Sequence, residues 1–358
     1  MMRLSRLVSC LGRLFRLGGG LVLLGGLVLL GGLAVLPAHA QEAGAGAFSR
    51  MGFGARGIAL GNALVADPSA NVSPHYNPAL LPAASGQRLA ASAALLSFDR
   101  ELQFLEFTAP LGPTAGIGLS LTHAGTQNID ARNADGARTG TLSTDEFALS
   151  LAFGNRFGER VSVGTALTVY QSDLVPDVDP ARGFGVDLGV GVRATDRLFV
   201  AAAVHDLLAQ YEWDASSVGG GSYTDEFPVR VRVGASYAML ERRLRVLGEV
   251  ESRTLARERA VPTVVITSGG PQQRSRTESF RQHGVQGRLG VAVRPVEILA
   301  VRAGLDRIGV DGTDGLRPSG GLGVRQSLGD LDLRLSYTAT LEPYVRTVMS
   351  TGTVELFL

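Results

Sequence analysis

The sequence predicts an all-β protein, a 14-stranded antiparallel transmembrane β-barrel with an N-terminal hatch segment in its lumen. Three observations predict this fold. Apolar and polar residues alternate with a period of two in fourteen segments after residue 85, and the connections between these segments alternate between short and long. No apolar run after residue 40 approaches the ~18 residues that a membrane-spanning helix needs, so strands of a closed barrel would have to cross the bilayer.

The first 40 residues are typical of a signal peptide. Four arginines and no acidic residue precede the apolar run 17–36, and Ala38-His39-Ala40 fits a small-x-small cleavage site. We therefore expect residues 1–40 to direct export through the Sec route and to be cleaved after Ala40. An uncleaved transmembrane helix is the alternative, since the apolar run is long enough to span a bilayer.

Composition excludes several kinds of chemistry. The single cysteine, Cys10, lies in the expected signal peptide, so the mature chain can form no disulfide, cysteine nucleophile or thiolate metal site. Loss of four arginines turns the net charge from +1 to −3, which argues against nucleic acid as a partner. The histidines lie in separate segments without ligand spacing, and no Ser-His-Asp spacing is found. We predict no metal, no cofactor, no catalytic residue and no enzyme activity.

The mature chain divides at residue 85. Residues 41–85 are rich in Gly, Ala, Asn and Pro with little alternation, which indicates an irregular hatch or plug segment with one short helix around 55–65. Residues 86–358 form the predicted barrel. Its clearest strand is Val229 to Tyr237, where apolar residues fill one face. The fourteen predicted strands are about 86–98, 101–110, 115–123, 144–154, 160–171, 183–194, 198–206, 227–240, 243–253, 283–294, 297–306, 317–327, 330–341 and 347–358.

The lengths of the connections predict how the barrel is oriented. Links after the even-numbered strands are tight, whereas most links after the odd-numbered strands are longer, with 124–143 and 254–282 among the longest. An even strand count with short turns on one side and long loops on the other is typical of outer-membrane barrels, whose short turns lie in the periplasm. This register places both ends of the barrel on the short-turn side. Val354, Leu356 and Leu358 also resemble the C-terminal strand signal that barrel-assembly machinery recognises.

The two faces of the strands differ in chemistry. In a membrane barrel the apolar face meets lipid and the polar face lines the lumen. The charged residues that this rule places in the lumen are Arg230, Arg232, Arg245, Glu249, Glu251, Arg288, Arg302, Asp332 and Arg334. Because an unpaired buried charge is costly, their mixed signs favour an internal ion-pair network. A charge-selective pore is the alternative.

The most specific stretch is 55–82. It contains Ala55-Arg56-Gly57, then Asp67-Pro68-Ser69-Ala70, then Asn77-Pro78-Ala79. This pattern resembles the N-terminal region of the FadL-like superfamily of fatty-acid channels and, more closely, the PorV/PorQ family. The resemblance implies a fourteen-stranded barrel whose N-terminal segment folds into the lumen as a hatch. The hatch and turn residues that it assigns are Arg56, Gly57, Asp67, Pro68, Asn77, Pro78 and Ala79, of which Asn77-Pro78 is a turn former able to pin the hatch to the wall.

The function expected from this resemblance is that of a bacterial outer-membrane protein of the PorV/FadL-like type. The main hypothesis is a role in type IX-like protein secretion or surface anchoring, with a secretion translocon and its cargo as partners. The alternative is a FadL-like channel for hydrophobic small molecules such as fatty acids. A soluble exported β-sandwich binding protein is the alternative from another class. Outer-membrane lipid and the barrel-assembly machinery are the further expected partners.

Overall fold

A computed structural model describes residues 44–69, 73–174, 178–267, 270–310, 315–329, 331–342 and 346–358, with side chains described except at 256–280 and 328. The expected signal peptide, residues 1–40, lies outside these residues. Within the described ranges, no helix has both the length and the apolar character needed to cross a bilayer.

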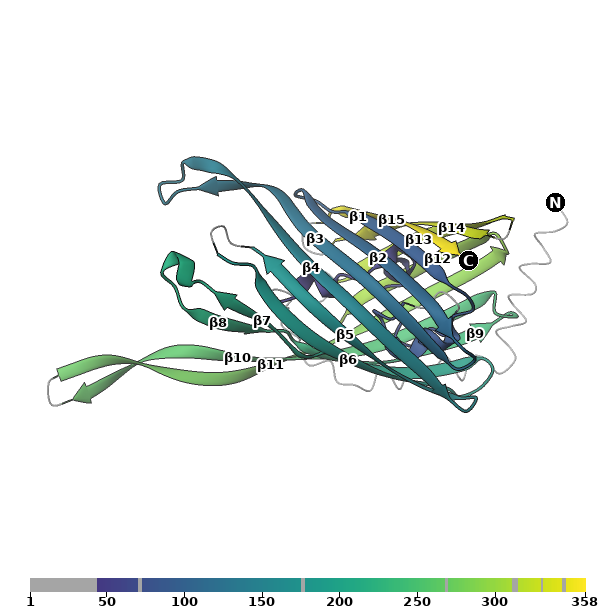
Figure 1. Ribbon diagram of the computed structural model, residues 1–358, viewed down its shortest axis with the longest axis horizontal. Coiled ribbons are helices and arrows are strands. Elements are labelled where there is room, and N and C mark those ends of the chain that lie inside the picture. Colours follow the sequence, from purple (N-terminus) through teal and green to yellow (C-terminus); the bar gives the residue numbers. More distant parts are fainter. Residues whose placement is uncertain are drawn as a thin grey trace. The chain divides into compact units, whose positions relative to one another are not determined.

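Fourteen antiparallel strands among the described residues form a closed barrel (Figure 1). Each strand pairs with its sequence neighbour, β6 pairs with β7, and β1 pairs with β15 through Arg88 and Phe357 to close the ring. The short strand β8, Ser222–Glu226, pairs with the end of β7 and stands outside this ring, so β7 is followed in the wall by β9. The wall strands are β1 Arg88–Leu95, β2 Arg100–Leu111, β3 Ala115–Arg132, β4 Arg138–Phe157, β5 Val161–Asp173, β6 Ala181–Arg193, β7 Leu198–Asp214, β9 Val229–Met239, β10 Leu244–Thr267, β11 Gly270–Val296, β12 Leu299–Ile308, β13 Arg317–Leu328, β14 Leu331–Leu341 and β15 Val348–Phe357. The predicted fold class is confirmed.

The predicted loops 124–143 and 254–282 are largely strand where the structure describes them. Residues 124–143 extend the β3–β4 hairpin, and residues 254–267 and 270–282 extend the β10–β11 hairpin, which projects far from the wall in Figure 1. The sequence pattern missed them because alternation is required only where one face meets lipid or a core. At the start of β4, residues 138–143 are exposed on both faces, so nothing there imposes a period of two.

The outer face of the barrel is apolar. On β5, Val163, Leu167 and Val169 are 39%, 47% and 56% exposed, whereas the alternate residues Ala166 and Thr168 are buried. Similar exposed Leu, Val and Phe residues occur on most wall strands. A water-soluble barrel would bury such residues, and an apolar surface of this extent is typical of a barrel whose wall contacts lipid.

The N-terminal segment, described at residues 44–69 and 73–85, lies inside the ring of strands (Figure 1). It contains η1 Ala47–Arg50, α3 Gly54–Ala59 and η2 Pro78–Ala83. The helix predicted around 55–65 is shorter, because Gly61 and Asn62 follow it with left-handed backbone angles. The buried apolar clusters join this segment to the inner wall, so the hydrophobic core of the molecule is the filled lumen.

Candidate functional site: the barrel interior

Four glycines of the wall lie in a row against η2. Inward-facing glycines on four neighbouring strands stand directly opposite one another: Gly116 on β3, Gly154 on β4, Gly164 on β5 and Gly189 on β6. A Cβ built on Gly154 would lie 2.6 Å from the carbonyl oxygen of Pro78, so only glycine allows η2 to approach this closely. We call these four residues the glycine row. Sequence reasoning missed this row, although a glycine at an inward position of each of four successive strands was a visible signal.

Asn77 fixes the start of η2. Its side-chain oxygen accepts a hydrogen bond from the Ala79 amide at 2.9 Å, and its side-chain nitrogen donates to the Val65 carbonyl at 2.9 Å. Pro78 occupies the first position of the helix, where its missing N–H costs nothing. The three predicted turn residues therefore lie together at the wall, with Asn77 fully buried.

Asp67 ties the N-terminal segment to β10. Its carboxylate accepts hydrogen bonds from Arg56, within the segment, and from Arg245 on the wall. Burial alone would raise the pKa of Asp67, but these two arginines hold it below its ordinary range. Gly57 lies nearby, and a Cβ there would clash with the hydroxyl of Tyr76.

Glu249 lies at the centre of a buried ion-pair network. It is 1% exposed and accepts hydrogen bonds from Arg232 Nε at 2.6 Å and Arg288 Nη1 at 2.6 Å. Its other oxygen accepts from the Val65 amide at 3.1 Å, which links the network to the N-terminal segment. Arg288 also contacts Glu251 at 2.9 Å, so the charges of the two signs are interleaved.

The remaining predicted charges lie apart from this centre. Arg230 pairs with Asp206 at 2.8 Å, and Arg302 is buried with a long 3.5 Å contact to Ser336. Arg334 lies 3.5 Å from Glu355, while Asp332 is only partly buried and pairs with Arg325. Sequence reasoning missed three buried charges on the opposite side: Arg88, Glu106 and Glu355, with Arg88 contacting the two carboxylates at 2.6 and 2.9 Å.

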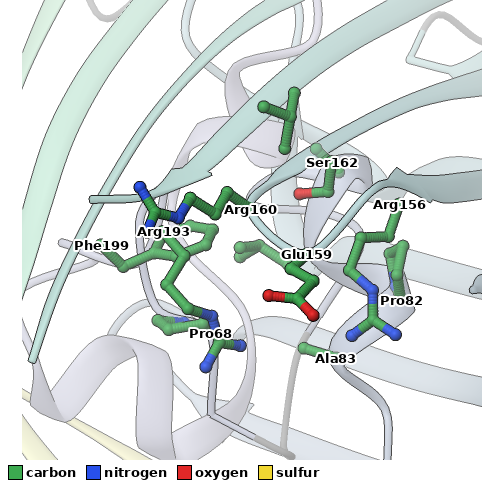
Figure 2. Close-up of a pocket in the computed structure, with 12 residues that line it drawn as sticks. Pro68, Pro82, Ala83, Arg156, Glu159, Arg160, Ser162, Arg193 and Phe199 are labelled. Atoms are coloured by element: carbon green, nitrogen blue, oxygen red, sulfur yellow. The ribbon is translucent and has the colours of Figure 1, made fainter. Parts of the chain in front are cut away.

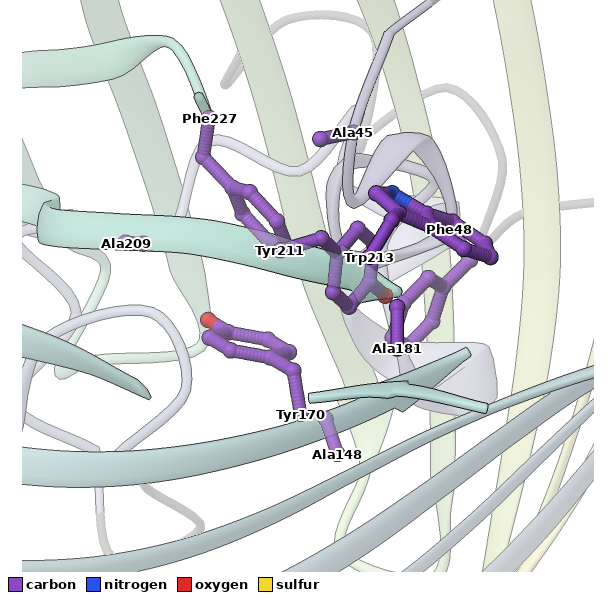
Figure 3. Packing of buried hydrophobic residues seen from close by; sticks show 9 residues of the cluster. All are labelled: Ala45, Phe48, Ala148, Tyr170, Ala181, Ala209, Tyr211, Trp213 and Phe227. Atoms are coloured by element: carbon purple, nitrogen blue, oxygen red, sulfur yellow. The ribbon is translucent and has the colours of Figure 1, made fainter. Parts of the chain in front are cut away.

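An aromatic cluster fills the lumen toward the long-loop end (Figure 3). Tyr170 of β5 and Tyr211 of β7 pack against Phe227, with ring centroids 4.7 and 4.9 Å away, and Trp213 lies 6.0 Å from Tyr211. Phe48 of η1 belongs to the same cluster, so it contains a ring from the N-terminal segment. We call these five residues the aromatic cluster. Sequence reasoning missed it because Tyr211 and Trp213 follow the last residue of the predicted strand 198–206.

A narrow internal cavity adjoins the aromatic cluster. It lies between the N-terminal segment, which contributes Phe53 and His75, and the inner faces of β3 to β7 and β9. Tyr170 lines both the cavity and the cluster. The space is small, with room for little more than water. A ligand larger than water could therefore enter only if the lining residues shifted.

The wall is irregular beside this cavity. The pairing of β6 with β7 shifts register on both sides of Val186, and Asp206 and Leu208 have left-handed φ angles of 59° and 61°. This bulge turns two consecutive residues, His205 and Asp206, into the lumen. Asp206 then accepts a hydrogen bond from the hydroxyl of Tyr170 at 2.9 Å.

A second pocket lies at the short-turn end (Figure 2). Pro68 and Pro82 of the N-terminal segment line it together with Arg156, Arg193 and Phe199 of the wall. Along β5, residues 161–162 line this pocket, Gly164 contacts η2, and residues 168 and 170 line the inner cavity. The segment η2 thus separates two recesses on the same side of the barrel. The described residues contain no group of three or more metal-ligating side chains.

No protein-family model matches the chain, and no curated protein matches it in sequence. Among solved structures it is similar to the toluene transporter TodX of Pseudomonas putida, with a TM-score of 0.57 and 15% identity over 85% of this chain and 96% of that chain. The deltaS2 mutant of the TodX monoaromatic hydrocarbon channel gives a TM-score of 0.55 and 13% identity over 85% and 97% of the two chains. A Pseudomonas aeruginosa FadL homologue gives a TM-score of 0.48 and 12% identity over 83% and 95% of the two chains. These likenesses show that the chain shares the barrel fold of TodX, and none of these structures is a PorV or PorQ protein.

Proposed function

We propose that this protein is an outer-membrane channel for hydrophobic small molecules. The observation that carries the proposal is the aromatic cluster with its adjoining cavity, which lies inside a closed barrel whose outer face is apolar. Rings gathered in a concave interior are the usual setting for binding an apolar ligand. The solved structures of similar fold include a toluene transporter, which supports this choice. The secretion or anchoring role that the PorV/PorQ resemblance favoured has no support among these structures, and the channel hypothesis replaces it.

Within this proposal, the N-terminal segment acts as a hatch. The two recesses on the β3–β7 side are separated where η2 rests on the glycine row, so a ligand can pass only if η2 moves. The other side of the segment is held by Asp67 and by the Glu249 network, so movement is expected to be confined to η2 and its neighbours. Export by residues 1–40, lipid contact along the outer face and insertion by the barrel-assembly machinery complete this proposal.

Uptake of toluene tests the channel. Cells that express the protein in a host without hydrocarbon channels should take up radiolabelled toluene faster than cells with an empty vector. Equal rates, at matched amounts of folded protein in the outer membrane, would contradict the proposal. Copurification with a large translocon in mild detergent, together with equal rates, would restore the secretion hypothesis.

A reversible cross-link tests the hatch. Leu81 of η2 and Ala166 of β5 belong to one buried cluster, so the variant Leu81→Cys/Ala166→Cys, with Cys10→Ser, can pin η2 to the wall. We expect the oxidised protein to lose toluene uptake and the reduced protein to regain it. Unchanged uptake after complete oxidation would show that η2 does not move during transport.

A further inference from the structure

Hydroxyl side chains form a row across three neighbouring wall strands. Ser120 of β3 stands directly opposite Ser150 of β4, which stands directly opposite Thr168 of β5. Thr122 lies on the same face of β3, two residues further along. All four residues line the internal cavity. We call them the hydroxyl row.

The hydroxyl row has no partner in the described protein. Ser120, Thr122 and Thr168 are 6%, 4% and 6% exposed, and Ser150 is partly buried. No hydrogen bond joins any of their hydroxyl groups to another residue within the described ranges. These hydroxyl groups are open to the cavity, where water or a ligand can take up their hydrogen bonds.

The charged groups of the cavity are already engaged. Asp206 accepts hydrogen bonds from Arg230 and from Tyr170, and Asp187 contacts His205 at 3.1 Å. The residues that line this cavity therefore include no unpaired cation that could bind an anionic ligand. The opposite side of the cavity is formed by the rings of Phe53 and His75, which pack edge to face at 4.3 Å.

We propose that the natural ligand is a neutral aromatic compound that carries a hydroxyl or carbonyl group, rather than a plain hydrocarbon. This inference rests on the proposed channel function. The ring would lie against Phe53 and Tyr170, and its polar group would exchange hydrogen bonds with the hydroxyl row. Because the cavity is narrow, the ligand enters as the N-terminal segment shifts. A site built to hydrogen-bond a polar group discriminates strongly against the analogue that lacks it.

Tryptophan fluorescence provides the test, because Trp213 is the only tryptophan of the chain and belongs to the adjoining aromatic cluster. The purified full-length barrel is titrated with three matched probes: benzyl alcohol, toluene and benzoate. We expect benzyl alcohol to bind with a Kd about tenfold lower than that of toluene, the effect of one well-formed hydrogen bond, and benzoate to bind weakly. In the variant Ser150→Ala/Thr168→Val the Kd values of benzyl alcohol and toluene should become equal. Ser143→Ala, an exposed hydroxyl on the same strand, should keep the preference.

The outcomes separate this inference from the proposed function. Toluene binding as tightly as benzyl alcohol would show that the hydroxyl row contributes nothing to binding, and would overturn the inference while leaving the channel intact. Tightest binding of benzoate, or an unchanged preference in the double variant, would overturn it too. Should the double variant fail to fold, Ser150→Ala alone is measured against Ser150→Thr, which keeps the hydroxyl and should keep the preference. If none of the three probes changes the fluorescence or enters cells, the channel itself is refuted.

Discussion

Neutralising Glu249 should destabilise the barrel by removing the shared partner of two buried arginines. Glu249 accepts hydrogen bonds from Arg232 and Arg288 at 2.6 Å each, and its carboxylate is shielded from water. Breaking a buried ion pair by removing one partner costs about 3–5 kcal/mol. Arg288 keeps Glu251, so we expect Glu249→Gln to lower the free energy of unfolding by about 3 kcal/mol, the lower end of that range.

The assay is urea-induced unfolding of the barrel in lipid vesicles, followed by the fluorescence of Trp213. The unfolding midpoint should fall while the slope of the transition stays constant. Glu226→Gln provides the matched control, because this glutamate is exposed near the long-loop end and should leave the midpoint unchanged. Equal midpoints for the two variants would refute the reasoning, since they would mean that the interior around Glu249 is wet.

Three further variants test other parts of the molecule. Gly154→Ala places a Cβ 2.6 Å from the carbonyl oxygen of Pro78 and should destabilise the barrel by about 1–3 kcal/mol. Gly352→Ala, with open space around it, should leave the stability unchanged. Equal urea midpoints for the two variants would contradict the close contact between η2 and the wall. Val233→Arg, at an outward position that is 50% exposed, should cost about 2–4 kcal/mol and reduce the folded fraction in vesicles; full insertion would place this face outside the hydrocarbon. Burial alone would raise the pKa of Asp67, but two arginines lower it below its ordinary value. The contribution of the ionised carboxylate to stability is therefore complete above pH ~4 and is lost only at lower pH. Protease resistance of the N-terminal segment should therefore hold from pH 7 to about pH 5 and fall in Asp67→Asn throughout, and a loss near pH 6 in the unmodified protein would contradict this.

The strands could be predicted because lipid imposes a strict rule on one face. On one face of β5, Val163, Leu167 and Val169 are apolar and exposed, and the alternate residues face the lumen, so a period of two is visible in the sequence. Beyond the lipid, neither face of a strand has to be apolar, and the sequence therefore predicts loops at the ends of β3, β4, β10 and β11. For the same reason the sequence does not predict that Tyr211 and Trp213 lie on a strand, although both have large rings that suit an interior position.

The interior could be predicted only in outline. Alternation identifies the residues that share the inner face, but strand register and the path of the N-terminal segment decide which of them meet. Glu249 contacts Arg288 because β10 and β11 pair in one particular register, and the Val65 amide joins them from about 180 residues earlier in the chain. The inward position of Asp206 could not be predicted, because its own left-handed backbone in the β7 bulge breaks the alternation. The consecutive residues His205 and Asp206 both point inward as a result.

The face of the strands that contacts hydrocarbon decides which side chains can line the lumen. Spin labels placed singly at Leu167, Thr168 and Val169, in protein carrying Cys10→Ser and reconstituted in lipid vesicles, measure this by their accessibility to oxygen and to a water-soluble nickel complex. We predict high accessibility to oxygen and low accessibility to nickel at Leu167 and Val169, which are 47% and 56% exposed, and poor accessibility to oxygen at Thr168, which is 6% exposed. Nickel reaching Leu167 and Val169 as readily as it reaches a label on an outer loop would contradict a lipid-facing wall.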